Sequence, residues 1–277
     1  YYFIKEVAVS TSINNAFITQ YERDVHDIFQ RNGSTLKPSV RFKSDVNGSV
    51  ATFQKIGTGV ATTKARHGTI TPMNQTHTAV STTLADFYAG DWVDKLDEAK
   101  INIDERQAIA RGGAMALGRK VDSQILTELD TTTQSTVTIT VTTSNQARNG
   151  LLDMIEAMIT NDAYEPGNMY GVMSPHLWAV ASTINEFASS DYVGSDGLPF
   201  NTGAAVGMFK RWGQVLWTVH SGVPGVGTST SKVFVWNKNA IGYASGKVPA
   251  NLAGTMGGET SVGADITWHG DRAAHFV

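Results

Sequence analysis

The sequence predicts an α+β fold, in which helices and strands follow one another without strict alternation. Two stretches rich in Val and Thr, 40–87 and 131–143, favour extended structure. Apolar residues recur at helical spacing in three other segments, 13–29, 103–129 and 151–159. A doubly wound sheet needs strands and helices that alternate, so this order argues against one.

The composition excludes several classes of protein. Of the 277 residues 41% are apolar and 17% are charged, below the roughly 25% of typical soluble domains, which suggests a surface covered by other protein. With a net charge of -3, the chain has no excess of basic residues of the kind that a dedicated nucleic-acid binder uses to neutralise phosphates. The absence of cysteine excludes disulfides and thiol chemistry. No apolar run approaches the roughly 20 residues of a membrane helix, and both chain ends look like cuts through a longer chain.

The first expected element is an amphipathic helix near the N-terminus. Ile13, Phe17, Tyr21, Val25 and Phe29 recur every four positions and form one apolar stripe. Something must cover that stripe in the folded protein.

A long β-hairpin is expected over 40–87, with a Thr-rich return strand over 76–84. The polar connection between its two arms carries Lys64, Arg66 and His67. A connection of this length has no core to bury, so it is either mobile or docked on a neighbouring molecule.

A long helix is expected over 103–129, with Asn102 as its N-cap and Glu105 as the capping-box partner. Its length would be roughly 40 Å at 1.5 Å per residue. The pair Gly112 and Gly113 costs about 1 kcal/mol per residue relative to Ala, so we expect another backbone to approach there.

Shorter elements fill the rest of the chain. A strand or hairpin is expected over 131–143, a helix from 151 to about 161, a strand over 169–173, and a further helix with Ser174 as N-cap and Pro175 in its first turn. After a loop over 191–203, four strands are expected, at 215–219, 232–236, 240–244 and 266–268.

No catalytic or metal-binding template is matched. The seven histidines are far apart and form no metal motif; they are His26, His67, His77, His176, His220, His269 and His275. The string Gly-Ser-Asp-Gly at 194–197 lacks the spacing of a nucleophilic serine, and 112–120 lacks the phosphate-loop pattern. Five tryptophans are not interleaved with basic residues, which favours packing in a core or subunit interface; they are Trp178, Trp212, Trp217, Trp236 and Trp268.

Carboxylates are concentrated between Asp86 and Glu105, and they include Asp94 and Asp97. Three interpretations remain open for this stretch. It is a solvated acidic surface, it faces Lys64 and Arg66 of a neighbouring subunit, or it supplies the acid pair of a carboxylate-dependent hydrolase.

Taken in order, four segments resemble the major capsid proteins of tailed double-stranded DNA bacteriophages with the HK97 fold, especially the short-tailed branch. They are NAFITQYE at 15–22, the long helix 103–129, YGVMSPHLW at 170–178 and VFVWNKNAIG at 233–242, with the long hairpin between the first two. None of these strings is a chemical signature, so the likeness rests on their order and spacing.

The resemblance implies an HK97-like organisation with four parts: an N-terminal arm and helix over 1–39, an extended loop over 40–90, a peripheral domain over 91–144 and 231–277, and an axial domain over 145–230. It implies a shell subunit without catalytic site, metal or cofactor, which assembles in the bacterial host cytoplasm into an icosahedral virion head. The implied partners are copies of itself in pentamers and hexamers, portal, scaffolding and decoration proteins, and packaged DNA bound without sequence specificity; no membrane is implied. The alternative is an encapsulin-like nanocompartment shell that encloses a cargo protein.

Overall fold

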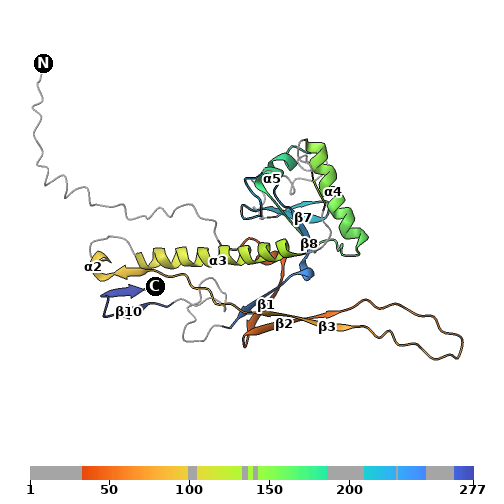
Figure 1. Cartoon of the computed structure of the whole chain (residues 1–277), viewed down its shortest axis with the longest axis horizontal. Helices are drawn as coiled ribbons and strands as arrows, with labels where there is room; N and C mark the ends of the chain where they lie inside the picture. The colour runs from red at the N-terminus through yellow and green to blue at the C-terminus, as the bar shows by residue number, and fades with distance from the viewer. Residues whose placement is uncertain are drawn as a thin grey trace, which may run out of the picture.

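A computed structural model describes residues 33–98, 105–132, 137–139, 143–185, 209–228, 230–247 and 265–277. A long central helix carries a mixed domain of helices and strands near one end, and a slender hairpin projects beyond that same end (Figure 1). The arrangement is α+β, as the sequence predicts.

The central helix α3 spans Glu105–Thr131 and confirms the predicted long helix, although the expected N-cap lies outside the described residues. Its 27 residues give a rod of roughly 40 Å. Of the glycine pair, only Gly113 meets another backbone, because a Cβ there would lie 3.2 Å from the carbonyl oxygen of Ala89, whereas one at Gly112 would meet nothing within 4 Å. Among the glycines of α3 the closest approach is at Gly118, where a Cβ would lie 2.7 Å from the carbonyl carbon of Gly33.

The predicted hairpin is confirmed by β2 (Val50–Ile56) and β3 (His77–Thr83), which pair antiparallel in one unbroken register from Val50↔Thr83 to Ile56↔His77. The preceding strand β1 (Arg41–Val46) pairs in parallel with β9 (Gly242–Gly246). The base of the hairpin is therefore held by chain that lies some two hundred residues later.

A four-stranded sheet lies beside the far end of α3. Its strand order is β6 (Lys210–Trp212), β7 (Val215–Val219), β5 (Met169–Met173) and β8 (Phe234–Asn237). Strand β5 runs parallel to β7 and antiparallel to β8. The predictions of β5 and β7 are confirmed in full, and β8 starts two residues later than expected.

Two helices accompany this sheet; α5 confirms its prediction, whereas α4 ends near the expected residue 161 but begins seven residues before the expected 151. Helix α4 spans Ser144–Thr160, and its N-cap Thr143 accepts from the backbone N–H of Gln146. Helix α5 spans Pro175–Ala181, and the Ser174 hydroxyl accepts from the backbone N–H of Leu177 at 3.3 Å. A proline tolerates the first helical turn because its missing N–H would have no partner there.

A separate three-stranded sheet has the order β10 (Thr267–His269), β11 (Ala274–Phe276) and β4 (Trp92–Asp94), and all its pairs are antiparallel. The one-turn helix α2 (Lys95–Glu98) follows β4 directly. In Figure 1 this sheet and α2 lie beside the start of α3, at the end of the molecule opposite the hairpin. The expected strand at 266–268 is confirmed with a shift of one residue.

Two apolar cores hold the four-stranded sheet, its helices and α3 together. One lies between the four-stranded sheet, α4 and α5, where Leu151, Met173, Leu177 and Trp217 are buried. The other joins the C-terminal half of α3 to the chain around Leu36 and to Trp236 of β8. The packing predicted for the tryptophans is confirmed for Trp217 and Trp236, while Trp268 remains 48% exposed.

Other predictions differ from the structure or fall outside it. The strand expected over 131–143 is wrong where the chain is described, because residues 137–139 belong to no strand. Strand β9 starts two residues later than expected, since Lys238–Ala240 forms the 3-10 turn η3. The helix expected over 13–29 and the loop over 191–203 lie outside the described residues. None of the helices searched in the described ranges is long and apolar enough to cross a membrane.

Candidate assembly surfaces

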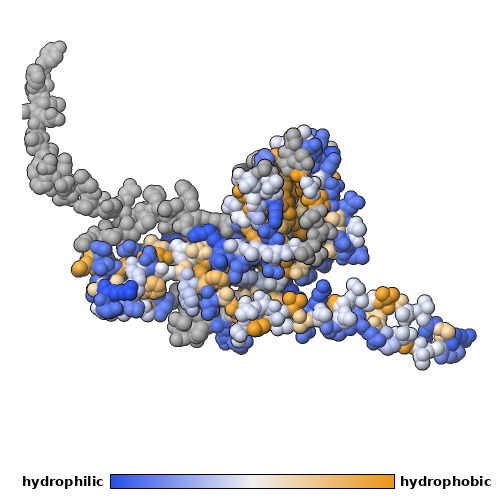
Figure 2. Space-filling model, viewed as in Figure 1, coloured by the Kyte–Doolittle hydropathy of each residue, from blue (hydrophilic) through white to orange (hydrophobic). Residues whose placement is uncertain are grey.

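The connection at the tip of the hairpin is exposed throughout. Residues 58–76 form no regular structure, and the hydrogen bond from the backbone N–H of Gly57 to the carbonyl of Thr76, 2.8 Å long, closes the ladder below them. Val60 and Ile70 are each 76% exposed in this segment. Figure 2 shows apolar residues scattered along this projecting arm among polar ones.

Both predicted cations of the tip, Lys64 and Arg66, are exposed. The Lys64 ammonium donates to the carbonyl oxygen of Gly68 at 3.3 Å, within the same loop. The tip thus presents positive charge and apolar side chains together on a segment that has no core.

The sheet formed by β4, β10 and β11 presents exposed aromatic rings. Trp92 is 37% and Trp268 is 48% exposed. The guanidinium of Arg272 lies 4.5 Å from the centre of the Trp92 ring, and the ammonium of Lys95 lies 5.3 Å from that of Trp268. These cation–π contacts hold the rings in place without covering them.

The acidic residues beside this sheet have local structural roles. The Asp94 carboxylate accepts from the backbone N–H of Leu96 at 2.7 Å, so it caps the start of α2. The Asp91 carboxylate accepts from the backbone N–H of Trp92 at 2.8 Å. Asp97 lies within α2 and is exposed. Within one chain the structure does not bring Asp94 and Asp97 to Lys64 and Arg66, because α2 and the hairpin tip lie at opposite ends of the molecule (Figure 1).

The buried carboxylate of Asp122 joins three segments of the chain. Asp122 lies in α3 and has no solvent exposure. One carboxylate oxygen, Oδ1, accepts from the Ser34 hydroxyl at 2.5 Å and from the Leu36 backbone N–H at 3.0 Å. The other, Oδ2, accepts from the backbone N–H and the hydroxyl of Thr35, each at 3.0 Å, and from His220 at 3.2 Å. We call these residues, Ser34–Leu36, Asp122 and His220, the Asp122 node.

The geometry fixes the proton on His220. Its Nδ1 accepts from the backbone N–H of Gly222 at 2.8 Å, so the proton of the neutral ring is on Nε2, which donates to Asp122. Burial alone would raise the pKa of Asp122, but the hydrogen bonds from His220, Ser34, Thr35 and Leu36 outweigh it and hold that pKa well below its usual range. The carboxylate is therefore ionised in the folded subunit at neutral pH.

Sequence reasoning missed the Asp122 node, although one signal was available. Asp122, Ile125, Leu126 and Leu129 follow the spacing of one helix face, and all four are buried. A carboxylate on the buried face of a helix needs several donors, so its position predicts a polar contact there. The donors themselves could not be named, because they lie 86 to 98 residues away.

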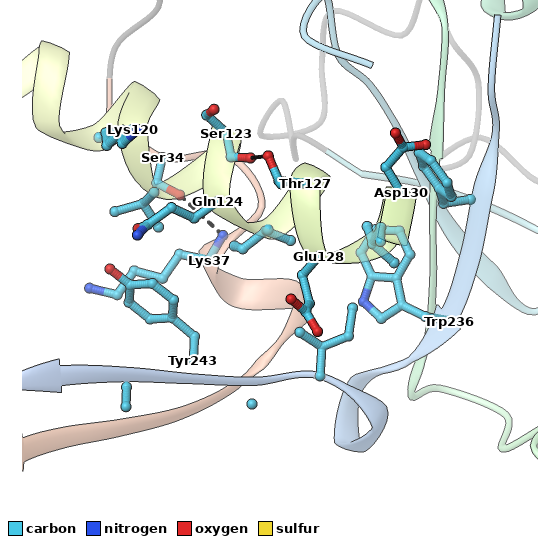
Figure 3. A pocket seen from close by; sticks show the side chains of 18 of the residues that line it. Ser34, Lys37, Lys120, Ser123, Gln124, Thr127, Glu128, Asp130, Trp236 and Tyr243 are labelled. Carbon is cyan, nitrogen blue, oxygen red and sulfur yellow. Dashed lines mark hydrogen bonds between the residues drawn. The ribbon is translucent and has the colours of Figure 1, made fainter. Parts of the chain in front are cut away.

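A broad groove runs along the outside of α3 towards β9. Figure 3 shows Lys37, Gln124 and Glu128 between α3 and the strand that carries Tyr243. The Lys37 ammonium lies 4.4 Å from the centre of the Phe42 ring, and that ring stacks on Tyr243 with a centroid distance of 5.9 Å. Asp130 and Lys232, which also line the groove, form a partly exposed ion pair with each other.

Ser34, Asp122 and His220 do not form a catalytic triad. No group of three His, Asp or Glu side chains in the described ranges could hold a metal ion. The hydroxyl of Ser34 donates to Asp122 rather than to a histidine, so this trio lacks the order of a nucleophile and its base. The arrangement stabilises structure, and the exposed surfaces are suited to contacts with protein.

Comparison with known proteins identifies relatives by sequence profile and by fold. The profile of a family described as phage capsid protein matches residues 13–251. A search of curated proteins found no match. A structure from Mycobacterium phage Che8 has a TM-score of 0.65 at 13% identity, over 99% of this chain and 91% of that one. The capsid of Ralstonia phage GP4 has a TM-score of 0.60 at 9% identity, over 93% of this chain and 87% of that one. The capsid structure of cyanophage P-SCSP1u has a TM-score of 0.57 at 12% identity, over 82% of this chain and 80% of that one.

Proposed function

The chain belongs to the phage capsid protein family, and on that premise we propose how its surfaces build a shell. Its fold is the HK97-like capsid fold that the sequence resemblance implied. It is a shell-forming major capsid protein, a structural component of the virion capsid that assembles with copies of itself. How the copies meet is our proposal.

The proposal rests on one observation: the hairpin exposes both faces of β3 and several apolar side chains at its tip. All seven residues of β3 are exposed, as are Val60 and Ile70 in the tip. A projecting arm of this kind buries almost no area in one molecule and gains area only against another. The hairpin tip therefore docks on a neighbouring copy.

The docking site for the tip is the sheet of β4, β10 and β11 on that copy. The tip carries Lys64 and Arg66, whereas Asp94 ends strand β4 and Asp97 follows it in α2, so the charges are complementary. Each exposed ion pair contributes only about 0 to 1 kcal/mol, so the exposed apolar and aromatic side chains supply most of the contact and the charges set its orientation. A contact between opposite ends of identical subunits is heterologous, and it closes into a pentamer or hexamer when each step rotates the next subunit by one fifth or one sixth of a turn.

The remaining parts of the proposal concern organisation and partners. The arm and helix take residues 1–39, the extended loop 40–90, the peripheral domain 91–144 with 231–277, and the axial domain 145–230. The shell encloses double-stranded DNA as a wall rather than a sequence-specific binder, in keeping with the net charge of -3. It assembles in the bacterial host cytoplasm with portal, scaffolding and decoration proteins, in a virus of the short-tailed branch, and has no catalytic activity.

Deletion of residues 58–71 tests the docking of the tip. The subunit should stay soluble and folded, because the deleted residues belong to no core, but electron microscopy should show no stable shells. Normal shells from the deleted subunit would refute the docking role.

Charge reversal tests the partner surface. Exchange of both Lys64 and Arg66 for Glu should lower the yield of shells, and Asp97→Lys added to that variant should restore part of it. Lys55→Glu is the matched control, since it reverses an exposed cation of the same hairpin outside the tip. An equal loss from the control would show that the hairpin needs positive charge in general and no particular contact.

Purified shells also separate the proposed function from its alternatives. Nucleic acid inside particles from infected cells supports the genome shell, whereas a folded cargo protein would support the nanocompartment. The hydrolase alternative requires turnover that falls on Asp97→Asn, and the shell predicts that this variant loses no activity.

A further inference from the structure

The outer edge of β3 is an unprotected strand edge. The register of the hairpin shows which of its backbone groups are free. The N–H of Leu84 donates to the carbonyl of Ser49, and the N–H of Gly57 donates to that of Thr76. In an antiparallel ladder the hydrogen-bonded pairs alternate with non-hydrogen-bonded ones. The N–H and C=O groups of His77, Ala79, Ser81 and Thr83 therefore point away from β2, into solvent.

This edge has none of the features that normally keep strands apart. Native proteins protect open edges with charged residues, prolines or β-bulges. Strand β3 (His77–Thr83) has no Lys, Arg, Asp, Glu or Pro, and its pairing with β2 is unbroken over seven residues. An edge of this length without protection is expected to be covered in the working form of the protein.

The opposite edge of the same hairpin, on β2, is covered in part by a charged side chain. On β2 the carbonyl oxygen of Thr52 points outward, and the ammonium of Lys43 donates to it at 3.2 Å. A charged side chain thus lies across the β2 edge, while the β3 edge, which pairs with it through Thr52↔Ser81, stays open. The contrast identifies β3 as the edge that accepts a partner.

We infer that β3 pairs antiparallel with β3 of a second copy across a two-fold axis at Val80, so that two hairpins form one four-stranded ribbon. This inference rests on the proposed function, since it names a contact between copies of the shell subunit. Ala79 then exchanges backbone hydrogen bonds with Ser81 of the partner subunit, and His77 does so with Thr83 of the partner subunit. A two-fold contact needs a self-complementary strand, and this strand brings no acidic or basic side chains together.

Single cysteines test the pairing and its register. The chain has no cysteine, so Val80→Cys introduces its only thiol, at a side chain that is 60% exposed. In a non-hydrogen-bonded antiparallel pair the two Cα atoms are about 4.5 Å apart, a distance that a disulfide spans. Thr82→Cys is the matched control on the same face, and its two thiols would be separated by four residues, roughly 13 Å.

Shells of each variant are mildly oxidised and run on a non-reducing gel. Val80→Cys should give covalent dimers and Thr82→Cys should stay monomeric. Monomers from intact Val80→Cys shells, or dimers from Thr82→Cys alone, would overturn the inference and leave the proposed function standing. If the wild-type chain forms no shells, the proposed function itself fails.

A proline pair tests the inference without cysteine. Ser81→Pro removes an outward N–H from the β3 edge, and Thr52→Pro removes the outward N–H of its direct partner on the β2 edge. Both changes place the same strain in the same rung of the ladder. Loss of shells with Ser81→Pro but not with Thr52→Pro supports the pairing, and intact shells with Ser81→Pro refute it.

Discussion

Replacement of Asp122 by Asn should destabilise the isolated subunit far more than a surface carboxylate would. Each carboxylate oxygen accepts at least two hydrogen bonds, and an amide nitrogen in place of either oxygen accepts none. A hydrogen bond to a charged group contributes about 1.5 to 3 kcal/mol, so the loss of two lowers the free energy of unfolding by about 3 kcal/mol or more. For a domain of 150–250 residues this lowers the melting temperature by roughly 6 to 12 °C.

The measurement uses dilute, unassembled subunits, with thermal unfolding followed by circular dichroism. Asp130→Asn is the matched control, because Asp130 lies on the same helix and forms an ion pair with Lys232 whose side chains are 34% and 54% exposed. An exposed pair of this kind is expected to contribute about 0 to 1 kcal/mol. Equal shifts for the two variants would refute the assignment of Asp122 as a structural node.

The stabilisation that Asp122 provides should also depend on pH. Because the hydrogen bonds hold the folded pKa of Asp122 below its usual range, the stabilisation is complete above the unfolded pKa of about 3.9 and is lost as the pH falls below it. The difference in unfolding free energy between wild type and Asp122→Asn should therefore stay constant from pH 7 to 5 and shrink below pH 4. A difference that grows on acidification would contradict the low pKa.

Three further predictions concern single sites. Gly118→Ala should cost about 1 to 3 kcal/mol because its Cβ would meet main chain within 3 Å, whereas Gly112→Ala on the same helix should stabilise by about 0.5 to 1 kcal/mol; urea unfolding compares the two. Burial lowers the pKa of Lys210 to about 8, so the wild type should gain stability relative to Lys210→Met as the pH rises from 8 to about 10. Trp236→Phe should cost about 1 kcal/mol or more in thermal unfolding, because it removes the 3.0 Å hydrogen bond from the indole N–H to the carbonyl of Ser39.

Features encoded within a few residues could be predicted from the sequence. The start of α5 follows from Ser174 and Pro175, and the long helix α3 from one apolar stripe. Strand β9 was misplaced by two residues for an equally local reason. The Asn237 side chain accepts from the backbone N–H of Asn239 and starts a 3-10 turn that delays the strand. Periodicity alone does not detect such a turn, because its residues continue the alternation.

Features that depend on distant partners could not be predicted. The parallel pairing of Arg41 with Gly242 joins segments whose own patterns carry no mark of each other. The same holds for His220, which the sequence presents as one isolated histidine among seven and the structure places against Asp122. Local sequence determines which element forms, whereas the choice of partner is made by the whole chain and leaves no local signal.

The Asp122 node has a structural consequence that an apolar contact would not give. Burial of apolar side chains such as Leu36 and Leu126 is non-directional and tolerates sliding of the chain along α3. Hydrogen bonds from two consecutive backbone N–H groups, those of Thr35 and Leu36, to one carboxylate allow a single position. The chain that enters β1 and the hairpin is therefore fixed to α3 at one point. An arm that must meet a neighbouring copy in register needs such a fixed origin, because an error at its base is carried along the full length of the hairpin to its tip.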